Sequence, residues 1–163
     1  MLIARPKGRA VLILIMNLKQ ANKMIIRFKQ KMNMPYSLHD SVVNRITLQN
    51  NAVHFEFNYG YVSTKEPYTQ ASGNITIEDV DMEFACVLLL SQLGKYGDFE
   101  GTKLSLKEFV EKHDEYFFEI IDEMYGYNQV EYIGYLNFPG KDDLIQMSLS
   151  LYFTGDVVYE TEE

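Results

Sequence analysis

The sequence contains no tryptophan, and Cys86 is the one cysteine among its 163 residues. A lone cysteine cannot close a disulfide within the chain, and scarce cysteine is typical of proteins that stay in a reducing compartment. Cys86 lies in the apolar stretch FACVLLL, where a buried, unreactive thiol is expected rather than a nucleophile. The sequence therefore predicts a cytoplasmic protein without a disulfide framework.

A run of apolar residues long enough to cross a bilayer is also missing. The run AVLILIM at residues 10–16 follows three cations but is far too short to span a membrane. It is at the lower limit for the core of a signal peptide, and no small-residue cleavage site follows it. The pattern therefore predicts neither a transmembrane helix nor a cleaved signal.

Signature motifs of catalytic and cofactor sites are absent as well. The chain has no G-x-S-x-G nucleophile motif, no P-loop and no G-x-G-x-x-G dinucleotide motif. The H-E-x-x-H zinc motif and the EF-hand loop are missing too, and Glu108 with Glu111 is expected to be a solvated acidic pair rather than a cation site. We predict no catalytic residue, no metal site and no cofactor, and a function other than catalysis.

Acidic residues are missing from the first 39 positions, and this absence divides the chain. Residues 1–39 carry eight cations, whereas the remainder carries all 23 acids and seven bases, a formal charge of −16. The change of sign falls near the stretch NMPYS, where Pro35 favours a break in regular structure. We predict a basic leader at 1–34 and a single acidic domain at 35–163, which is long enough to bury its own core.

The leader has the pattern of a basic amphipathic helix. Its apolar positions are Ala21, Met24, Ile25, Phe28 and Met32, and its cations recur every fourth residue at Lys19, Lys23, Arg27 and Lys31. Three interpretations stay open. The leader docks on an acidic body of the same or another chain, it contacts an anionic membrane or a nucleic acid, or it is a mis-assigned start upstream of Met32 or Met34.

The acidic domain is expected to be an α+β, mainly β fold, with a curved antiparallel sheet of about seven strands and one short helix. Apolar and polar residues alternate in VVNRITLQ and in NAVHFEFNY, and Asn50-Asn51 between them favours a two-residue turn. That register pairs Leu48 with Val53 and places Tyr59 on the same inner face as Val53.

Five further strands are predicted, at residues 75–80, 82–90, 116–125, 130–138 and 145–153. The second of these is apolar on both faces and is therefore expected at the centre of the sheet. Residues 60–74 and 94–103 have loop composition. Ser105 is a predicted N-cap with Glu108 at the third helical position, so a helix should end near Asp114 and bury a stripe that includes Phe109.

The three histidines do not form a recognisable catalytic group. His39 and Asp40 are adjacent, and because neighbouring strand residues point to opposite faces, this pair is expected to be structural rather than a dyad. His54 shares the solvated side of its strand with Glu56. His113 belongs to the inner stripe of the helix, where a hydrogen-bonded structural histidine is expected.

Tyrosines and acids gather in one stretch, FEIIDEMYGYNQVEYIGYL. The candidate partner-binding residues in it are Glu119, Asp122, Glu123, Tyr125, Tyr127, Glu131, Tyr132 and Tyr135. Tyrosine is enriched at protein interfaces because it buries a large area while it keeps a hydroxyl, and surrounding acids steer a basic partner. The alternative is that the tyrosines fill the sheet and the acids keep it soluble.

The stretches LHDSVVNRI and EIIDEMYGYNQVEYIGYL resemble small uncharacterised bacterial proteins, mostly from Firmicutes. The resemblance covers the chain from about Tyr36 onward and does not include the leader. Some of those proteins are similar to immunity proteins of polymorphic toxin systems. The resemblance implies a cytoplasmic, non-enzymatic protein that binds and blocks a toxin domain, and it supplies no active-site residues.

Three hypotheses for function follow. The first is an acidic module that binds a basic protein partner, such as a toxin domain, through the tyrosine-rich stretch. The second is a small-ligand binder or an enzyme with a pocket in the curved sheet, for which His39, Asp40 and His113 are the candidates. The third is attachment to a membrane through the leader. Nucleic-acid binding by the acidic domain is disfavoured, because its charge repels phosphate.

Overall fold

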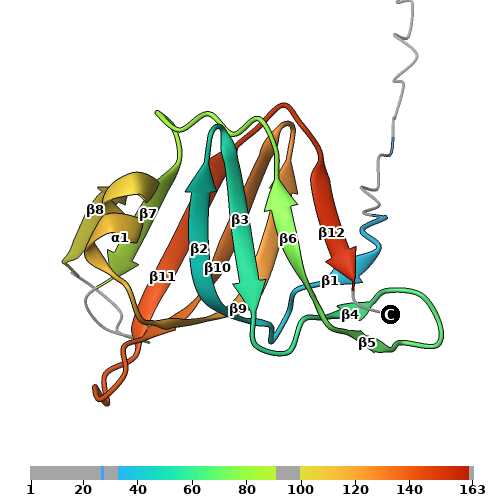
Figure 1. Cartoon of the computed structure of the whole chain (residues 1–163), viewed down its shortest axis with the longest axis horizontal. Coiled ribbons are helices and arrows are strands. Elements are labelled where there is room, and N and C mark those ends of the chain that lie inside the picture. The colour runs from blue at the N-terminus through green and yellow to red at the C-terminus, as the bar shows by residue number, and fades with distance from the viewer. Residues whose placement is uncertain (1–26, 28–32, 91–99, 162–163) are drawn as a thin grey trace, which may run out of the picture. The chain divides into compact units, whose positions relative to one another are not determined.

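Antiparallel strands dominate the computed structural model, which describes residues 27, 33–90 and 100–161 (Figure 1). The elements are β1 (Tyr36–Ser37), β2 (Val42–Gln49), β3 (Ala52–Phe57), β4 (Tyr61–Ser63), β5 (Gln70–Ala71), β6 (Gly73–Ile77), β7 (Cys86–Leu90), β8 (Gly101–Ser105), α1 (Leu106–Lys112), β9 (Phe117–Gly126), β10 (Gln129–Asn137), β11 (Ile145–Tyr152) and β12 (Val157–Thr161). Nine of the described strands form one sheet in the order β12-β6-β3-β2-β9-β10-β11-β7-β8, and β1, β4 and β5 form a small second sheet. The predicted mainly β fold, with an antiparallel sheet and one short helix, is confirmed.

The large sheet folds over on itself between β2 and β9. These strands pair at Val42 with Glu119 and at Val43 with Phe118, and then separate. In Figure 1, β2, β3 and β6 lie in front of β9, β10 and β11, and the rings of Phe55 on β3 and Tyr132 on β10 meet between them at a centroid distance of 5.7 Å. The two halves therefore enclose the core, and we call the line where β2 leaves β9 the seam.

The predicted β2–β3 hairpin has the register that its alternation indicates. Leu48 pairs with Val53, and Asn50 takes a positive φ of 54° in the two-residue turn, a conformation that asparagine tolerates. The inward placement of Tyr59 is wrong, because β3 ends at Phe57 and the Tyr59 side chain is 74% exposed. The local alternation of apolar and polar residues therefore predicted the pairing of β2 with β3 correctly, but it did not predict where β3 ends.

The helix begins and ends close to the predicted positions. The Ser105 hydroxyl accepts a hydrogen bond from the Glu108 N–H at 3.2 Å, and the Glu108 carboxylate accepts one from the Ser105 N–H at 2.9 Å. This reciprocal pair satisfies donors that the first helical turn leaves free. Leu106 and Phe109 are buried, and α1 packs against β8, β7 and β2.

The predicted number of strands was too low. The strands predicted at 116–125, 130–138 and 145–153 match β9, β10 and β11 to within one residue at each end. However, β4 and β5 lie within residues 60–74, which were predicted to be a loop, and β8 begins within the second predicted loop, residues 94–103. No strand was predicted at the positions of β1 and β12. These short strands lack clear alternation, and their pairing with strands elsewhere in the fold holds them in place.

The predicted central strand at residues 82–90 is also corrected. Residues 82–84 form a turn in which the Asp81 carboxylate accepts a hydrogen bond from the Glu83 N–H, so the strand begins only at Cys86. It lies next to the last strand of the sheet, β8, and Leu88 on its outer side is 36% exposed. Cys86 is half-buried on that same side rather than in the core, because Val87 takes the inward position.

The predicted leader helix lies outside the described residues, apart from Arg27 and the last residues of the leader. The proposals for docking, for membrane contact and for an upstream mis-start therefore stay predictions. Within the described ranges, no helix is long and apolar enough to cross a membrane.

Candidate functional site

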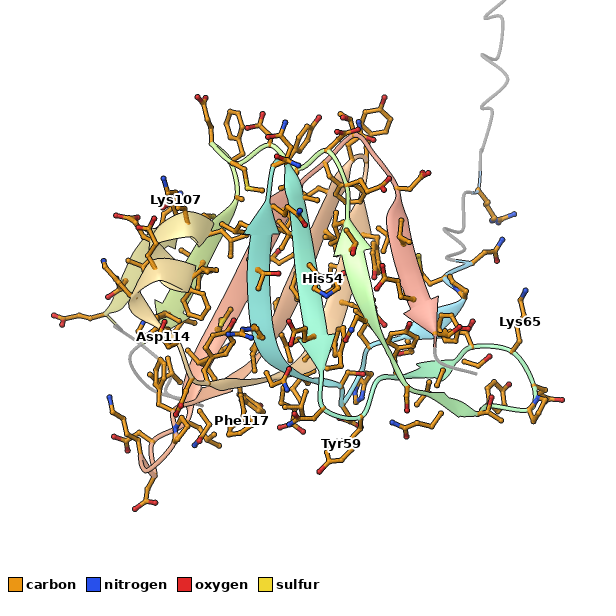
Figure 2. All side chains as sticks on the ribbon, viewed as in Figure 1. His54, Tyr59, Lys65, Lys107, Asp114 and Phe117 are labelled. Atoms are coloured by element: carbon orange, nitrogen blue, oxygen red, sulfur yellow. The ribbon has the colours of Figure 1, made fainter. Side chains whose placement is uncertain are left out.

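The two outer surfaces of the folded sheet differ in chemistry. On the half formed by β12, β6, β3 and β2, the outward side chains are mainly polar, as with Thr47, His54, Glu56 and Thr76 (Figure 2 labels His54). The outer surface of the other half, which we call the acidic–apolar face, carries Glu119, Asp122 and Met124 on β9, Glu131, Ile133 and Tyr135 on β10, Gln146, Ser148, Ser150 and Tyr152 on β11, Cys86, Leu88 and Leu90 on β7, and Lys103 on β8. A solvated sheet face needs no such apolar side chains.

Several apolar residues of the acidic–apolar face are open to solvent. Met124 is 48% exposed, and Tyr152 is 40% exposed. Glu131 accepts a hydrogen bond from the Ser148 hydroxyl across β10 and β11, so that carboxylate has a fixed position among the apolar groups. The face therefore combines acidic groups with accessible apolar area.

The eight predicted partner-binding residues do not share one surface. Glu119, Asp122, Glu131 and Tyr135 lie on the acidic–apolar face, and Tyr127 stands beside it in the β9–β10 turn, where it is 89% exposed. Glu123, Tyr125 and Tyr132 point to the inner side of the sheet.

A β-bulge explains this division. Ile133 pairs with Asp122 but Gly134 pairs with Ile120, so Ile121 is an extra residue in β9. After the bulge, the alternation of β9 is shifted by one, and Glu123 rather than Asp122 faces inward. Simple alternation from the buried Ile120 would have given the opposite result.

The inward-facing residues form a tyrosine cluster with Tyr159 of β12, in which Tyr132 is buried and Tyr125 and Tyr159 are partly buried. The Glu123 carboxylate accepts hydrogen bonds from the Ser37 hydroxyl, the Leu38 N–H and the Tyr125 hydroxyl, at 3.0, 3.0 and 3.1 Å. Burial raises the pKa of Tyr125 and of Tyr132 far above its ordinary value, and it raises the pKa of Tyr159 to about 12. These tyrosines stay neutral at physiological pH; Tyr132 belongs to the core, and Tyr125 and Tyr159 pack against it.

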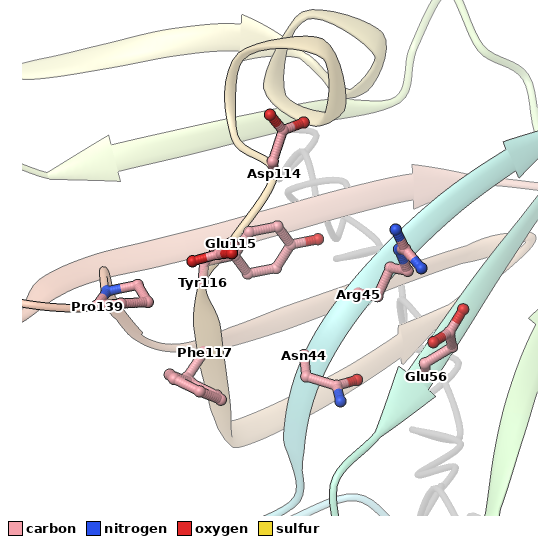
Figure 3. Close-up of a pocket in the computed structure, with 8 residues that line it drawn as sticks. All are labelled: Asn44, Arg45, Glu56, Asp114, Glu115, Tyr116, Phe117 and Pro139. Atoms are coloured by element: carbon pink, nitrogen blue, oxygen red, sulfur yellow. The ribbon is translucent and has the colours of Figure 1, made fainter.

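A cavity of about 270 Å³ opens at the seam, and we call it the seam pocket (Figure 3). It is lined by Asn44, Arg45, Glu56, Asp114, Glu115, Tyr116, Phe117 and Pro139. Asn44 is the extra residue of a second bulge, since Val43 pairs with Phe57 but Arg45 pairs with Glu56. The divergence of β2 from the segment that leads into β9 creates the space.

Tyr116 is the most deeply buried of the residues that line the seam pocket. Its side chain is 4% exposed, and Figure 3 shows its ring reaching from the α1–β9 connection toward Arg45. The Tyr116 hydroxyl makes no hydrogen bond to any described residue. Burial raises the pKa of Tyr116 to about 12, and two nearby groups partly oppose this rise: the Ile46 backbone, which approaches the hydroxyl without regular hydrogen-bond geometry, and the Arg45 guanidinium.

The charged residues of the seam pocket were not identified from the sequence. Arg45 lies directly across the β2–β3 pair from Glu56, yet within the described part of the chain neither residue forms an ion pair, and nor do Asp114 and Glu115. Between Asp40 and Lys65, Arg45 is the one lysine or arginine and Glu56 is the one acid, and the hairpin register that sets them opposite each other was the available signal.

The histidines occupy three unrelated places, none of them in the seam pocket. His39 and Asp40 do meet, with Nδ1 and Oδ1 at 3.0 Å, so the expectation that they point apart is wrong. They lie in a turn rather than a strand, Asp40 has a φ of 64°, and both side chains are more than half exposed. His54 Nδ1 contacts the Thr76 hydroxyl at 2.9 Å on the polar outer surface.

His113 lies at the C-terminal end of α1 between two aromatic rings. Its ring centroid is 5.0 Å from that of Phe109 and 4.8 Å from that of Phe138. Burial, and then the nearby Lys112 and Lys141, lower the pKa of His113. No hydrogen bond links its ring to another described residue, so ring packing holds this histidine instead of the expected hydrogen bond.

Metal binding has no support in the described ranges, where no three His, Cys, Asp or Glu side chains are grouped as a metal ion requires. In comparisons with known proteins, no family model, no curated protein and no solved structure matches the chain.

Proposed function

We propose that this protein is a non-enzymatic binding module that receives a basic protein partner on its acidic–apolar face. The observation that carries the proposal is the contrast between the two outer surfaces of one sheet. One surface is polar in the way of ordinary solvated strands, whereas the other exposes Met124, Leu88 and Tyr152. Exposed apolar side chains that share a face with fixed charges are typical of protein interfaces.

Charge complementarity favours a basic partner. Glu119, Asp122 and Glu131 lie on the face itself and outnumber Lys103, which stands opposite Leu88 on β8, and the chain from residue 40 onward carries a formal charge of −16. Such a field accelerates the approach of a basic protein and opposes acidic ones. The apolar side chains then supply area whose burial stabilises the complex.

The resemblance to immunity-like bacterial proteins suggests a specific form of this function. In that form the partner is a basic toxin domain, and binding blocks its active surface. A neighbouring gene for a large toxin with a basic C-terminal domain would support this form. The binding face is the same whether or not the partner is a toxin.

A photo-crosslinking experiment tests the proposed face. The photoreactive residue p-benzoylphenylalanine is placed at Tyr135 on the acidic–apolar face and, as a matched control, at the exposed Gln49 on the outer side of β2. In the native cell, position 135 should give a defined adduct with a basic protein, and position 49 should not. Addition of Glu131→Lys should weaken that adduct, because the substitution reverses a charge on the face.

Three crosslinking results would contradict the proposed binding face. Identical adducts from both positions would show nonspecific contact. An acidic partner, or an adduct that survives charge reversal at both Asp122 and Glu131, would contradict the electrostatic basis of the proposal.

A further inference from the structure

The seam pocket adjoins the acidic–apolar face. Phe117 lines the pocket, and Glu119 of the acidic–apolar face is two residues further along β9 on the same side of the strand. Phe117 is 43% exposed, so its ring is open to a ligand at the boundary between the two. A partner that covers the face would therefore reach the pocket at one end of its interface.

The chemistry of the seam pocket selects a positively charged group. Its three carboxylates and one guanidinium give a formal charge of −2. Arg45 offsets one of the three negative charges, and Asp114 and Glu115, which form no ion pair within the described ranges, can balance the charge of a ligand. An anionic ligand would meet this surplus of negative charge.

The Tyr116 hydroxyl gives an independent indication of a ligand. It is buried and borders the pocket, and although the Ile46 backbone lies close enough to lower its pKa, the hydroxyl forms no hydrogen bond of regular geometry with any described residue. A buried polar group without a partner is costly, and a bound donor would remove that cost. An ammonium or guanidinium group supplies such donors and carries no acceptor.

We propose that the seam pocket binds one lysine or arginine side chain of the basic partner. In this arrangement the Tyr116 hydroxyl accepts a hydrogen bond from the cationic head, and Asp114 and Glu115 balance its charge. Phe117 and Pro139 contact the alkyl stem, and the Phe117 ring favours a nearby cation. The inference rests on the proposed function for the identity of the partner, but the preference for a cation is a property of the pocket alone.

A peptide titration tests the pocket directly. The ¹⁵N-labelled full chain is titrated with acetyl-Gly-Arg-Gly-amide and, separately, with the citrulline peptide, which has nearly the same shape and no charge. The arginine peptide should cause saturable amide shifts at Arg45, Glu115 and Phe117, and the citrulline peptide should bind at least about threefold more weakly.

Variants separate the contributions of the individual groups. Glu115→Gln should weaken binding of the arginine peptide about two- to fivefold, which corresponds to a partly exposed ion pair. Tyr116→Phe should weaken it about two- to tenfold through loss of one hydrogen bond. Glu83→Gln, an exposed acid in the turn before β7, is the matched control and should have no effect.

The proposal for the seam pocket and the proposal for the acidic–apolar face can be contradicted independently. Equal shifts with both peptides, or shifts that do not saturate at the seam, would overturn the pocket proposal. If position 135 still crosslinks a basic partner while Glu115→Gln and Tyr116→Phe leave that adduct unchanged, the binding function stands and the pocket is not its anchor.

Discussion

Glu123 accepts a hydrogen bond from the backbone N–H of Leu38 at 3.0 Å, although 85 residues separate the two in the sequence. The same carboxylate oxygen accepts a bond from the Ser37 hydroxyl, and the other oxygen accepts one from the Tyr125 hydroxyl. Leu38 is buried in the core beside this contact. One inward-facing carboxylate of β9 therefore attaches the segment that follows the leader to the large sheet.

Replacement of Glu123 by alanine should destabilise the domain by about 2 kcal/mol, because hydrogen bonds to a charged group are among the stronger ones and the Leu38 N–H would lose its partner. Urea unfolding should show a lower midpoint with an unchanged slope. Asp122→Ala is the matched control, since Asp122 is exposed on the outer surface, and it should change stability by less than about 0.5 kcal/mol. Equal losses of stability in both variants would mean that the contact between Glu123 and Leu38 does not stabilise the domain.

Gly134 stands opposite the bulge that turns Glu123 inward. A Cβ at this position would collide with the carbonyl oxygen of Glu119 on the neighbouring strand. Gly134→Ala should therefore cost about 3 kcal/mol or prevent folding, because neither backbone can move without breaking the β9–β10 pair. Gly126→Ala in the same hairpin is the control, since its Cβ would meet Gln129 at an ordinary 3.8 Å. Thermal unfolding of both variants distinguishes the close approach from a general effect of removing glycine.

The elements that the sequence predicted well are those that local pattern alone determines. The β2–β3 hairpin follows from strict alternation around Asn50, and the start of α1 follows from the Ser105 and Glu108 pair. The helix and the strands β9 to β11 need only nearest neighbours along the chain or across one turn to be recognised.

The candidate site was harder to predict because it depends on bulges and on long-range packing. The extra Ile121 reverses the face on which Glu123 and Tyr125 lie, and no turn residue or proline indicates it. The fold at the seam brings Arg45 to Tyr116, and 70 residues lie between them. A period-two pattern contains neither the position of a bulge nor the line along which a sheet folds.

Tyr116 should make the domain sensitive to alkaline pH. Burial raises its pKa from 10.0 to about 12, so its neutral form is favoured in the folded state. The stability that the neutral Tyr116 contributes is fully present below its unfolded-state pKa of 10.0. It is lost as the pH rises toward the folded-state pKa of about 12. The loss should be on the order of 2 kcal/mol by pH about 12.

The comparison with Tyr116→Phe isolates this effect. Phenylalanine does not ionise, so the variant should lose less stability than the parent chain between pH about 9 and 12. Urea unfolding at several pH values measures the difference, and the other buried tyrosines contribute equally to both proteins. Parallel pH profiles for the parent and the variant would contradict a raised pKa at Tyr116.

The capping box at Ser105 and Glu108 should stabilise α1 in a manner that depends on pH. Removal of the hydroxyl in Ser105→Ala should cost about 1 kcal/mol, whereas Ser105→Asn should retain most of the stability, since asparagine also accepts at an N-cap. The backbone N–H and then the hydroxyl of Ser105 lower the pKa of Glu108. A lowered carboxyl pKa means that the Glu108 contribution is present above its ordinary value and is lost as the pH falls through the folded pKa. The stability gap between the parent chain and Glu108→Gln should therefore narrow on acidification, and a gap that stays constant down to pH about 3 would show that the carboxylate charge plays no part in the cap.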